Sequence, residues 1–130
     1  MILPDTNVWI EYLRQNKDFV QEFNTLLEGK FIITFEPVFA ELLYGARSEK
    51  DRRILKGFWN VLPKIEKTEN MILEAAVFAN SENYQNLGIG LFDAVIIQTS
   101  MKNKLKLWTL DKKIIRTIEE KYIYNSNTNY

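Results

Sequence analysis

Four acidic residues, each placed where an apolar stretch meets polar sequence, constrain the fold of this chain more than any other feature. They are Asp5, Glu41, Asp93 and Asp111. An unpaired charge is costly to remove from water, so acids in apolar settings need a compensating cation. Carboxylate oxygens favour Mg²⁺ or Mn²⁺. The pattern therefore predicts that distant segments fold to bring these side chains to a shared divalent ion.

Segments typical of strands and of helices alternate along the 130 residues. Pro63 is tolerated in an edge strand but not in a central one, while Ser48 and Thr68 are of the types that begin helices. Such alternation indicates an α/β fold with a mainly parallel sheet and helices on both faces. Strands are expected at residues 1–3, 31–34, 61–65, 104–109 and 122–124, and helices at residues 8–13, 18–28, 49–60, 69–87 and 112–120, with two more that carry Glu41 and Asp93.

The predicted topology brings the acids to one edge of the sheet. In open α/β sheets, ligands bind outside the carboxyl ends of the strands. Asp5 ends the first strand, and Asp111 follows the strand that ends at Thr109. Glu41 and Asp93 come early in helices that are entered from the same side. Carboxylates that converge repel one another unless a metal is bound or some of them are protonated.

Each acid also has an explanation that needs no metal. Asp5 and Asp93 could favour the N-terminus of a helix, and Asp111 could form a turn or a cap. Glu41 could lie on a solvated helix face, although apolar residues flank it on both sides. The combination of all these acids is more specific than any one of them.

Neutral and basic residues near the acids complete the candidate site. Asn7 and Thr109 carry oxygens that could position water, phosphate or a carboxylate, and turn or cap formation is the alternative. Arg14 and Arg47 belong to elements that also carry site candidates, so we expect them to contact phosphate. The other basic residues considered are expected to be mostly ordinary solvated surface: Lys17, Arg52, Arg53, Lys56, Lys102, Lys104, Lys106, Lys112 and Lys113.

The residue types that the chain lacks narrow its chemistry. It has no cysteine, which excludes disulfides, zinc–thiolate sites and cysteine nucleophiles and fits the reducing cytoplasm. It has no histidine, so a hydrolase would activate water with a carboxylate, a lysine or a metal. A formal net charge of zero is mild evidence against a passive nucleic-acid binder but not against a nuclease. We expect no membrane partner, because no apolar run is long enough to span a bilayer and the N-terminus lacks a signal-peptide pattern.

Two other ligand-binding families fit the sequence poorly. The loop Gly88-Ile89-Gly90 lacks the third glycine of a dinucleotide-binding fingerprint and follows a helix, whereas that fingerprint follows a strand. A phosphorelay receiver normally needs an acidic pair after its first strand, and here Asp5 is followed by Thr6 and Asn7.

Four segments of the chain resemble those of PIN-domain ribonucleases, and most closely those of VapC-type toxins from toxin–antitoxin modules. They read ILPDTNVWI at residues 2–10, AELLYGA at 40–46, LFDAVII at 91–97 and LWTLD at 107–111. They occur in the family's order and spacing. The resemblance implies a three-layer α/β/α sandwich that occupies residues 1–124, with a polar tail at residues 125–130.

The resemblance also implies a site and partners. It implies metal-dependent cleavage of RNA by Asp5, Glu41, Asp93 and Asp111, assisted by Thr6, Asn7 and Thr109. Many such proteins form homodimers and are inhibited by an antitoxin that fills the active-site groove. Among the aromatic residues of this chain, the candidates for such an interface are Trp9, Tyr12, Phe39 and Phe58.

The working hypothesis is an endoribonuclease that uses Mg²⁺ or Mn²⁺. A DNA nuclease of the same fold is one alternative, and the small size of the chain argues against it because there is no room for extra DNA-clamping elements. A catalytically silent interaction module is another, and the retention of all four acids argues against it. The sequence leaves open the RNA target, the antitoxin and the number of metal ions.

Overall fold

A computed structural model describes residues 1–126 of the chain and shows a parallel sheet at its centre. Strands β1 (Ile2–Pro4) and β2 (Lys106–Trp108) pair in parallel, with Leu3 opposite Leu107. Single parallel bridges continue the sheet on both sides and join Ile2 to Ile32, Thr34 to Lys64, and Leu107 to Ile123. The predicted α/β fold with a parallel sheet is therefore confirmed.

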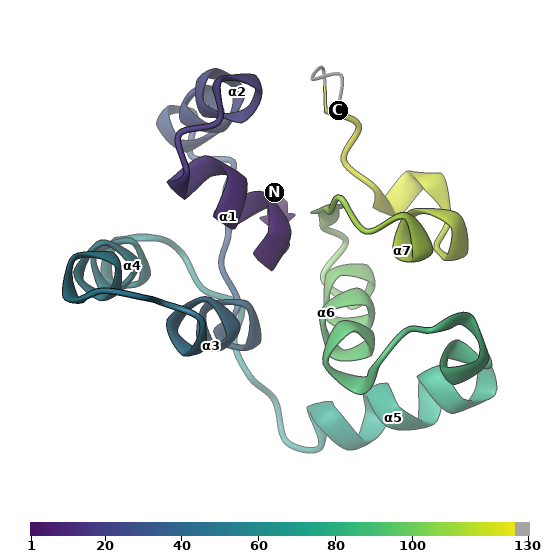
Figure 1. The fold of residues 1–130 in the computed structure, drawn as a ribbon. Helices are drawn as coiled ribbons and strands as arrows, with labels where there is room; N and C mark the ends of the chain where they lie inside the picture. Colours follow the sequence, from purple (N-terminus) through teal and green to yellow (C-terminus); the bar gives the residue numbers. More distant parts are fainter. Residues whose placement is uncertain (127–130) are drawn as a thin grey trace.

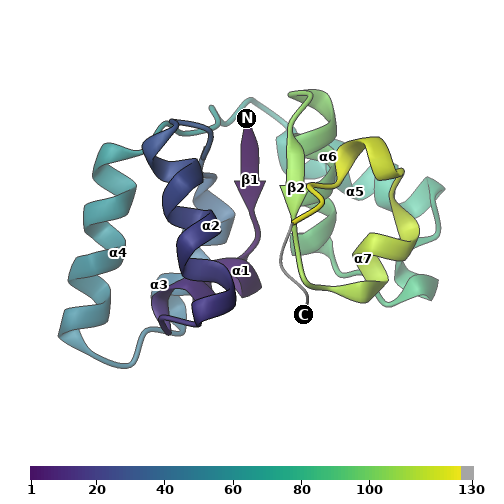
Figure 2. The same cartoon turned by 90° about the horizontal axis from the view of Figure 1, so that it is seen from above.

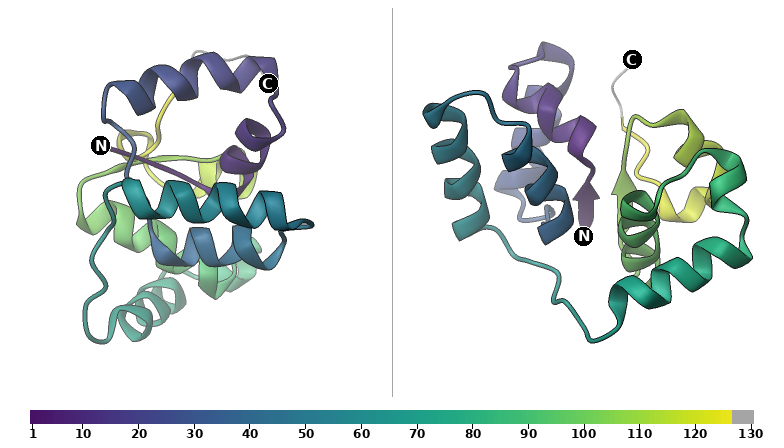
Figure 3. Two further views of the ribbon diagram at one scale, coloured as in Figure 1. Left: turned by 90° about the vertical axis from the view of Figure 1, so that its left-hand side faces the viewer. Right: turned by 60° about the horizontal axis from the view of Figure 1, so that its bottom comes forward.

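The helices form two layers around this sheet. Those from α1 to α4 lie on one side of β1 and β2, and those from α5 to α7 lie on the other (Figures 1 and 2). Residues 62–70 cross from one side to the other (Figure 3). The elements are α1 (Thr6–Leu13), α2 (Lys17–Glu28), α3 (Glu36–Tyr44), α4 (Glu49–Val61), α5 (Met71–Ser81), α6 (Leu91–Lys102), α7 (Lys112–Thr117) and the 3₁₀ helices η1 (Tyr84–Leu87) and η2 (Glu120–Tyr122).

The sheet is smaller than the sequence predicts. Residues 31–34, 61–65 and 122–124 were expected to be strands, but each contributes only isolated bridges. Two hydrogen bonds join Thr34 to the segment around Lys64. The Thr34 amide donates to the Pro63 carbonyl, and the Ile65 amide donates to the Thr34 carbonyl. Pro63 has no N–H to donate, so the ladder cannot extend further in that direction.

Left-handed asparagines break a helix that the sequence predicts as continuous. The expected helix at residues 69–87 is divided into α5 and η1 at Asn83, whose φ is 57°. Asn70, with φ 63°, precedes α5, so Thr68 does not cap it. Asparagine tolerates this conformation better than most residues do. Ser48 does cap α4 as predicted, since its Oγ accepts from the Asp51 amide at 3.1 Å.

An aromatic cluster fills the layer formed by α1 to α4. The Trp9 ring lies 4.8 Å from Phe23 and 5.1 Å from Phe39, and Tyr12 stacks on Phe23 at 4.1 Å. Phe58 lies 5.2 Å from Trp9. Trp9, Tyr12, Phe39 and Phe58 were candidates for an interface, and these candidates are wrong, because the first three are buried and Phe58 packs against the core.

Helix α5 exposes apolar side chains instead. Leu73 and Val77, which are one turn apart, are 66% and 72% exposed, and Ile72 is 59% exposed. We call these three residues the α5 stripe. Glu74 of the same helix pairs with Lys102, which leaves the stripe itself uncharged. No helix within residues 1–126 combines the length and apolarity needed to cross a bilayer.

The expected polar tail at residues 125–130 begins beside α2. The hydroxyls of Tyr124 and Ser126 both donate to the carboxylate of Glu22. Residues 127–130 of the tail lie outside the described part of the chain.

Candidate functional site

The structure places the four predicted acids at the ends of elements that meet at one edge of the sheet. Asp5 directly follows β1, Asp111 precedes α7, and Asp93 lies in the first turn of α6. Glu41 lies in the second turn of α3, somewhat later in its helix than predicted. The negative charges of Asp5, Glu41 and Asp111 all act on Asp93. The four predicted acids therefore lie near enough to interact electrostatically, but within residues 1–126 no three of them are grouped closely enough to hold a metal ion as they stand.

Asp5 is held at the centre of a network of hydrogen bonds. Its Oδ1 accepts from the Thr6 amide at 2.7 Å, and its Oδ2 accepts from the Thr109 hydroxyl at 2.8 Å. Its own amide donates to the Trp108 carbonyl at 2.8 Å, which ties it to β2. Burial raises the pKa of the Asp5 carboxyl, and the negative charge of Asp111 adds to the rise. The hydrogen bonds from the Thr109 hydroxyl and the Thr6 amide oppose it.

Thr6, Asn7 and Thr109 hold the acids in place. The Thr6 hydroxyl donates to Oε2 of Glu41 at 3.0 Å. The Thr109 oxygen, besides donating to Asp5, accepts from the Asp111 amide at 3.1 Å and from the Asn7 side chain at 3.4 Å. Asn7 Oδ1 accepts in turn from the Leu110 amide. One donor and two acceptor sites match the capacity of a hydroxyl group, so Thr109 links the segments that carry Asp5 and Asp111.

Asp93 differs from Asp5 in its surroundings. Its side chain is half-buried, and its carboxylate accepts no hydrogen bond from residues 1–126. Burial raises the pKa of Asp93 to about 6, the charges of Asp5, Glu41 and Asp111 contribute to the rise, and the cation of Lys113 opposes it. At neutral pH this carboxylate therefore carries a charge in a place that disfavours negative charge.

Helix capping accounts for part of the acid pattern. Asp5 caps α1 through the Thr6 amide, and Asp111 caps α7 by accepting from the Lys113 amide at 2.9 Å. The residue that precedes α6 is Gly90, which offers no side-chain cap, and Asp93 does not replace it. Capping therefore explains one role of Asp5 and Asp111, and Asp93 lies in the first turn of α6, where a negative charge is favourable. Glu41 lies in the second turn of α3 and has no role at a helix terminus.

The donor set fits a hard divalent cation. In the described part of the chain, no three acidic side chains stand close enough together to form a metal centre as they are. The residues that would hold an ion offer carboxylate oxygens, which suit Mg²⁺ and Mn²⁺. The mutual repulsion that raises the pKa of Asp93 is what a bound cation would relieve.

Arg14 and Arg47, which were predicted to contact phosphate, line one cavity of about 340 Å³ together. It lies between α1, α3 and α4, and its walls include Ile10, Leu42 and Asp51. The rise of an α-helix places Arg14 about 12 Å along α1 from Thr6. The two arginines are thus brought together, at some distance from the acids.

A second pair of cations was not singled out from the sequence. Lys113 and Arg116 line a cavity of about 460 Å³ between α7 and η1, together with Tyr84 and Leu87. Lys113 was assigned to ordinary solvated surface, and Arg116 was not considered. The signal that could have found them is their spacing of three residues directly after Asp111, because residues three apart share one face of a helix.

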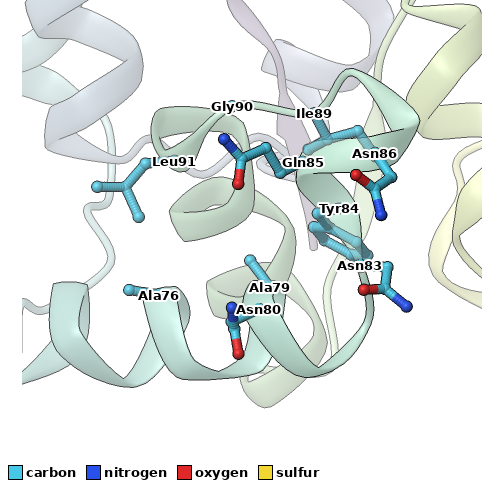
Figure 4. A pocket seen from close by; sticks show the side chains of 10 residues that line it. All are labelled: Ala76, Ala79, Asn80, Asn83, Tyr84, Gln85, Asn86, Ile89, Gly90 and Leu91. Carbon is cyan, nitrogen blue, oxygen red and sulfur yellow. The ribbon is translucent and has the colours of Figure 1, made fainter.

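An uncharged cavity lies on the other side of η1. It has a volume of about 400 Å³, and Tyr84 borders both it and the cationic cavity. The side chain of Gln85 extends toward Leu91 across the space above Ala76 and Ala79 (Figure 4). None of the ten described residues that line it is charged. This cavity therefore offers amide and apolar contacts but no counter-charge for a phosphate or a metal.

Comparison with known proteins agrees with this architecture. One similar structure is VapBC2 from Rickettsia felis bound to a DNA fragment from their promoter, with a TM-score of 0.74 and 21% identity over 95% of this chain and 96% of the other. A toxin–antitoxin complex from Klebsiella pneumoniae has a TM-score of 0.69 and 19% identity over 95% of this chain and 100% of the other. VapBC-1 from nontypeable Haemophilus influenzae has a TM-score of 0.67 and 22% identity over 90% of this chain and 92% of the other. No curated protein matches the chain in sequence.

At such identities the structural likeness concerns the fold alone. The sequence itself matches the model of one family, the PIN domain, over residues 2–120. That match covers all four acids and nearly the whole described chain. The chain therefore belongs to the PIN domain family.

Proposed function

We propose that the chain is a metal-dependent endoribonuclease and the toxin of a toxin–antitoxin module. PIN domains are generally nucleases that use divalent metal ions, and the similar structures described above include toxin–antitoxin complexes. The observation that supports the proposal is that Asp5, Glu41 and Asp111 are linked through Thr6 and Thr109 and that their charges act on Asp93. The nuclease domain would comprise residues 1–124, and the protein would act in the cytoplasm.

In the proposed mechanism the acids hold Mg²⁺ or Mn²⁺. Asp5, Glu41 and Asp93 would bind one ion, and Asp111 would complete that site or help to hold a second ion. Such an ion, when bound, activates water and stabilises negative charge on a phosphate. The absence of histidine leaves no imidazole base to share this task.

The neutral residues act as positioning residues. The Thr6 hydroxyl holds one oxygen of Glu41, and the Thr109 hydroxyl holds one oxygen of Asp5. Because a carboxylate has two oxygens with several lone pairs, each acid keeps acceptor capacity for an ion after these bonds form. Fixing the acids in advance lowers the conformational cost of binding the ion and the substrate.

Cleavage assays separate the proposal from its alternatives. Labelled single-stranded RNA and DNA would each be incubated with the protein in Mg²⁺, in Mn²⁺ and in chelator. We expect RNA cleavage in either metal and none in chelator. Cleavage of DNA but not RNA would favour a DNA nuclease of this fold. No cleavage of either strand, by protein that binds metal, would favour a silent interaction module.

The proposed partners are an antitoxin and a second copy of the chain. An arginine or lysine of the antitoxin would approach the acids and take the place of the metal's charge. Full ribonuclease activity in a co-purified complex of the two proteins would contradict this form of inhibition.

The α5 stripe is the surface that best fits a second copy. Its apolar side chains are exposed, and two uncharged stripes related by a twofold axis would meet without like charges. Light scattering at tens of micromolar should show a dimer, and Leu73→Asp should give a monomer. Val61→Asp changes an equally exposed apolar residue at the end of α4 and should leave the dimer intact. A wild-type monomer would contradict the proposed homodimer.

A further inference from the structure

We propose that Lys113 and Arg116 bind the phosphate that follows or precedes the scissile one on the RNA strand, in the cavity between α7 and η1. This inference rests on the proposed function and deepens it. It identifies the side of the acidic site along which the strand runs. It also assigns a role to two cations that the sequence did not distinguish from ordinary surface.

The backbone of Lys113 is anchored beside the acids, and its side-chain stem passes close to Gly88. Its amide donates to the Asp111 carboxylate at 2.9 Å, which anchors the backbone beside the acids. Its side chain crosses Gly88, where a Cβ would meet the Lys113 Cδ at 3.3 Å. Gly88 has φ 77°, a conformation that favours glycine. The loop after η1 therefore leaves room for the lysine stem beside the cavity.

Arg116 supplies a second cation from the same helix face. It lies three residues after Lys113, and both side chains line the cavity. Neither takes part in any of the five ion pairs found among the described residues. Glu82 also lines the cavity but forms no ion pair with either cation in that part of the chain. Two cations that form no ion pair among the described residues are therefore available to an external anion.

The location favours a nucleic-acid phosphate over an acidic peptide. The Lys113 amide donates to the carboxylate of Asp111 at 2.9 Å, so the cavity that its side chain lines adjoins the acidic site where the scissile phosphate would lie. Successive phosphates of one strand must lie on both sides of that position. Lys113 and Arg116 would neutralise the negative charge of the strand beside a cluster of acids that would otherwise repel it.

The test measures RNA affinity and its dependence on salt. A fluorescent single-stranded RNA of mixed sequence would be titrated in chelator, which prevents cleavage, at several salt concentrations. We expect the double variant Lys113→Ala, Arg116→Ala to bind at least tenfold more weakly. The slope of log affinity against log salt should become shallower by about 0.7, the value for one lost phosphate contact on a single strand. With Mn²⁺ present, KM should rise and kcat should change little.

Matched variants separate this role from a general loss of charge. Lys113→Arg with Arg116→Lys keeps both cations and should keep most of the affinity. Lys56→Ala removes an exposed cation from α4, on the other side of the sheet, and should change neither affinity nor slope (Figure 2). Because Lys113 and Arg116 are exposed, all these variants should fold, and a thermal melt would verify it.

The possible outcomes distinguish this inference from the proposed function. If RNA is cleaved and the double variant binds it with unchanged affinity and slope, the inference is overturned while the nuclease stands. If the protein cleaves only DNA, the proposed function fails, and a loss of DNA affinity in the double variant would still support the phosphate site. Loss of affinity for the antitoxin alone, or no binding of any nucleic acid, would overturn the inference.

Discussion

Two cation-lined cavities differ in how much of their charge the protein already uses. Each cavity is lined by one acid, Asp51 or Glu82, but only Arg14 forms an ion pair within residues 1–126, at 3.7 Å from Glu11. Arg47, Lys113 and Arg116 form no ion pair among the described residues, and the charge of Lys113 acts on Asp93 without a direct contact being formed. A cation without a partner gains more from binding a phosphate than one that must exchange a carboxylate for it. The difference therefore predicts that the affinity for RNA depends more on the cavity lined by Lys113 and Arg116 than on the cavity lined by Arg14 and Arg47.

The four acids provide the strongest test, because neither cavity has a role in cleavage without them. Asp5→Asn, Glu41→Gln or Asp93→Asn should each reduce kcat by about 10²-fold or more, since each removes charge that holds the metal. Asp111→Asn should have a smaller effect. Single-turnover cleavage of RNA in Mn²⁺ would measure this. Near-wild-type turnover by folded Asp5→Asn would refute the site.

Metal binding should stabilise the folded protein through the same acids. At an ion concentration of about 100 times Kd the gain in unfolding free energy should be about 2.7 kcal/mol. Asp93→Asn should lose most of this gain, whereas alanine variants of either cation pair should keep it. Thermal melts with Mn²⁺ and with chelator would compare the variants. An unchanged shift in Asp93→Asn would show that the ion binds elsewhere.

The pH dependence of the metal-free protein should also distinguish the two cavities. The pKa of Asp93 is raised to about 6 in the folded chain from 3.8, so the folded state binds more protons than the unfolded state between these values. The contribution of Asp93 to stability should therefore fall as pH rises from about 4 to about 6. Asp93→Asn should lack this component of the profile.

Removing the Lys113 cation should raise the pKa of Asp93 further, because that cation favours the charged carboxylate. In Lys113→Ala the fall in stability should extend to higher pH, while Arg14→Ala should retain the wild-type profile. Chemical denaturation in chelator across pH 4–8 would show the difference. Identical profiles for the wild type and Lys113→Ala would contradict the proximity on which the phosphate site depends.

The smallest loss of RNA affinity is expected from substitution of Arg14 and Arg47, the arginines predicted from the sequence to contact phosphate. Arg14→Ala with Arg47→Ala should weaken RNA binding by only about 2- to 5-fold, within the range of about 1 kcal/mol or less that exposed charges contribute. The same anisotropy titration would measure it. A loss larger than that of the Lys113 and Arg116 double variant would reverse the comparison and place the RNA strand along α1.

Much of the acidic site could be predicted from local sequence. Asp5 and Asp111 each follow a short apolar strand, and parallel strands end at a common edge, so their proximity follows from the strand pattern. The apolar residues around Glu41 and Asp93 indicated that these acids are not ordinary surface. The alternation of elements also predicted the parallel sheet, because hydrophobic periodicity is a local property of the chain.

Other features depended on which segments meet. The aromatic residues of α1 were candidates for an interface, but Trp9 is fully buried against side chains of α2, α3 and α4. The break at Asn83 arises where a left-handed residue redirects the chain, and a helical pattern in the sequence does not reveal it. Both the burial of a side chain and the end of a helix depend on contacts with residues far away in the sequence. A short stretch of sequence does not contain these contacts.

The sequence by itself determined the chemistry available to this protein: four acids, no histidine, no cysteine and a PIN-like order of motifs. Only the tertiary structure decided how the cations relate to that chemistry. Lys113 follows Asp111 by two residues, yet its role depends on Gly88, which lies 25 residues earlier and leaves room for its stem. Electrostatic interactions act through space and depend on distance and burial, so residue type alone could not separate Lys113 and Arg116 from the other surface cations.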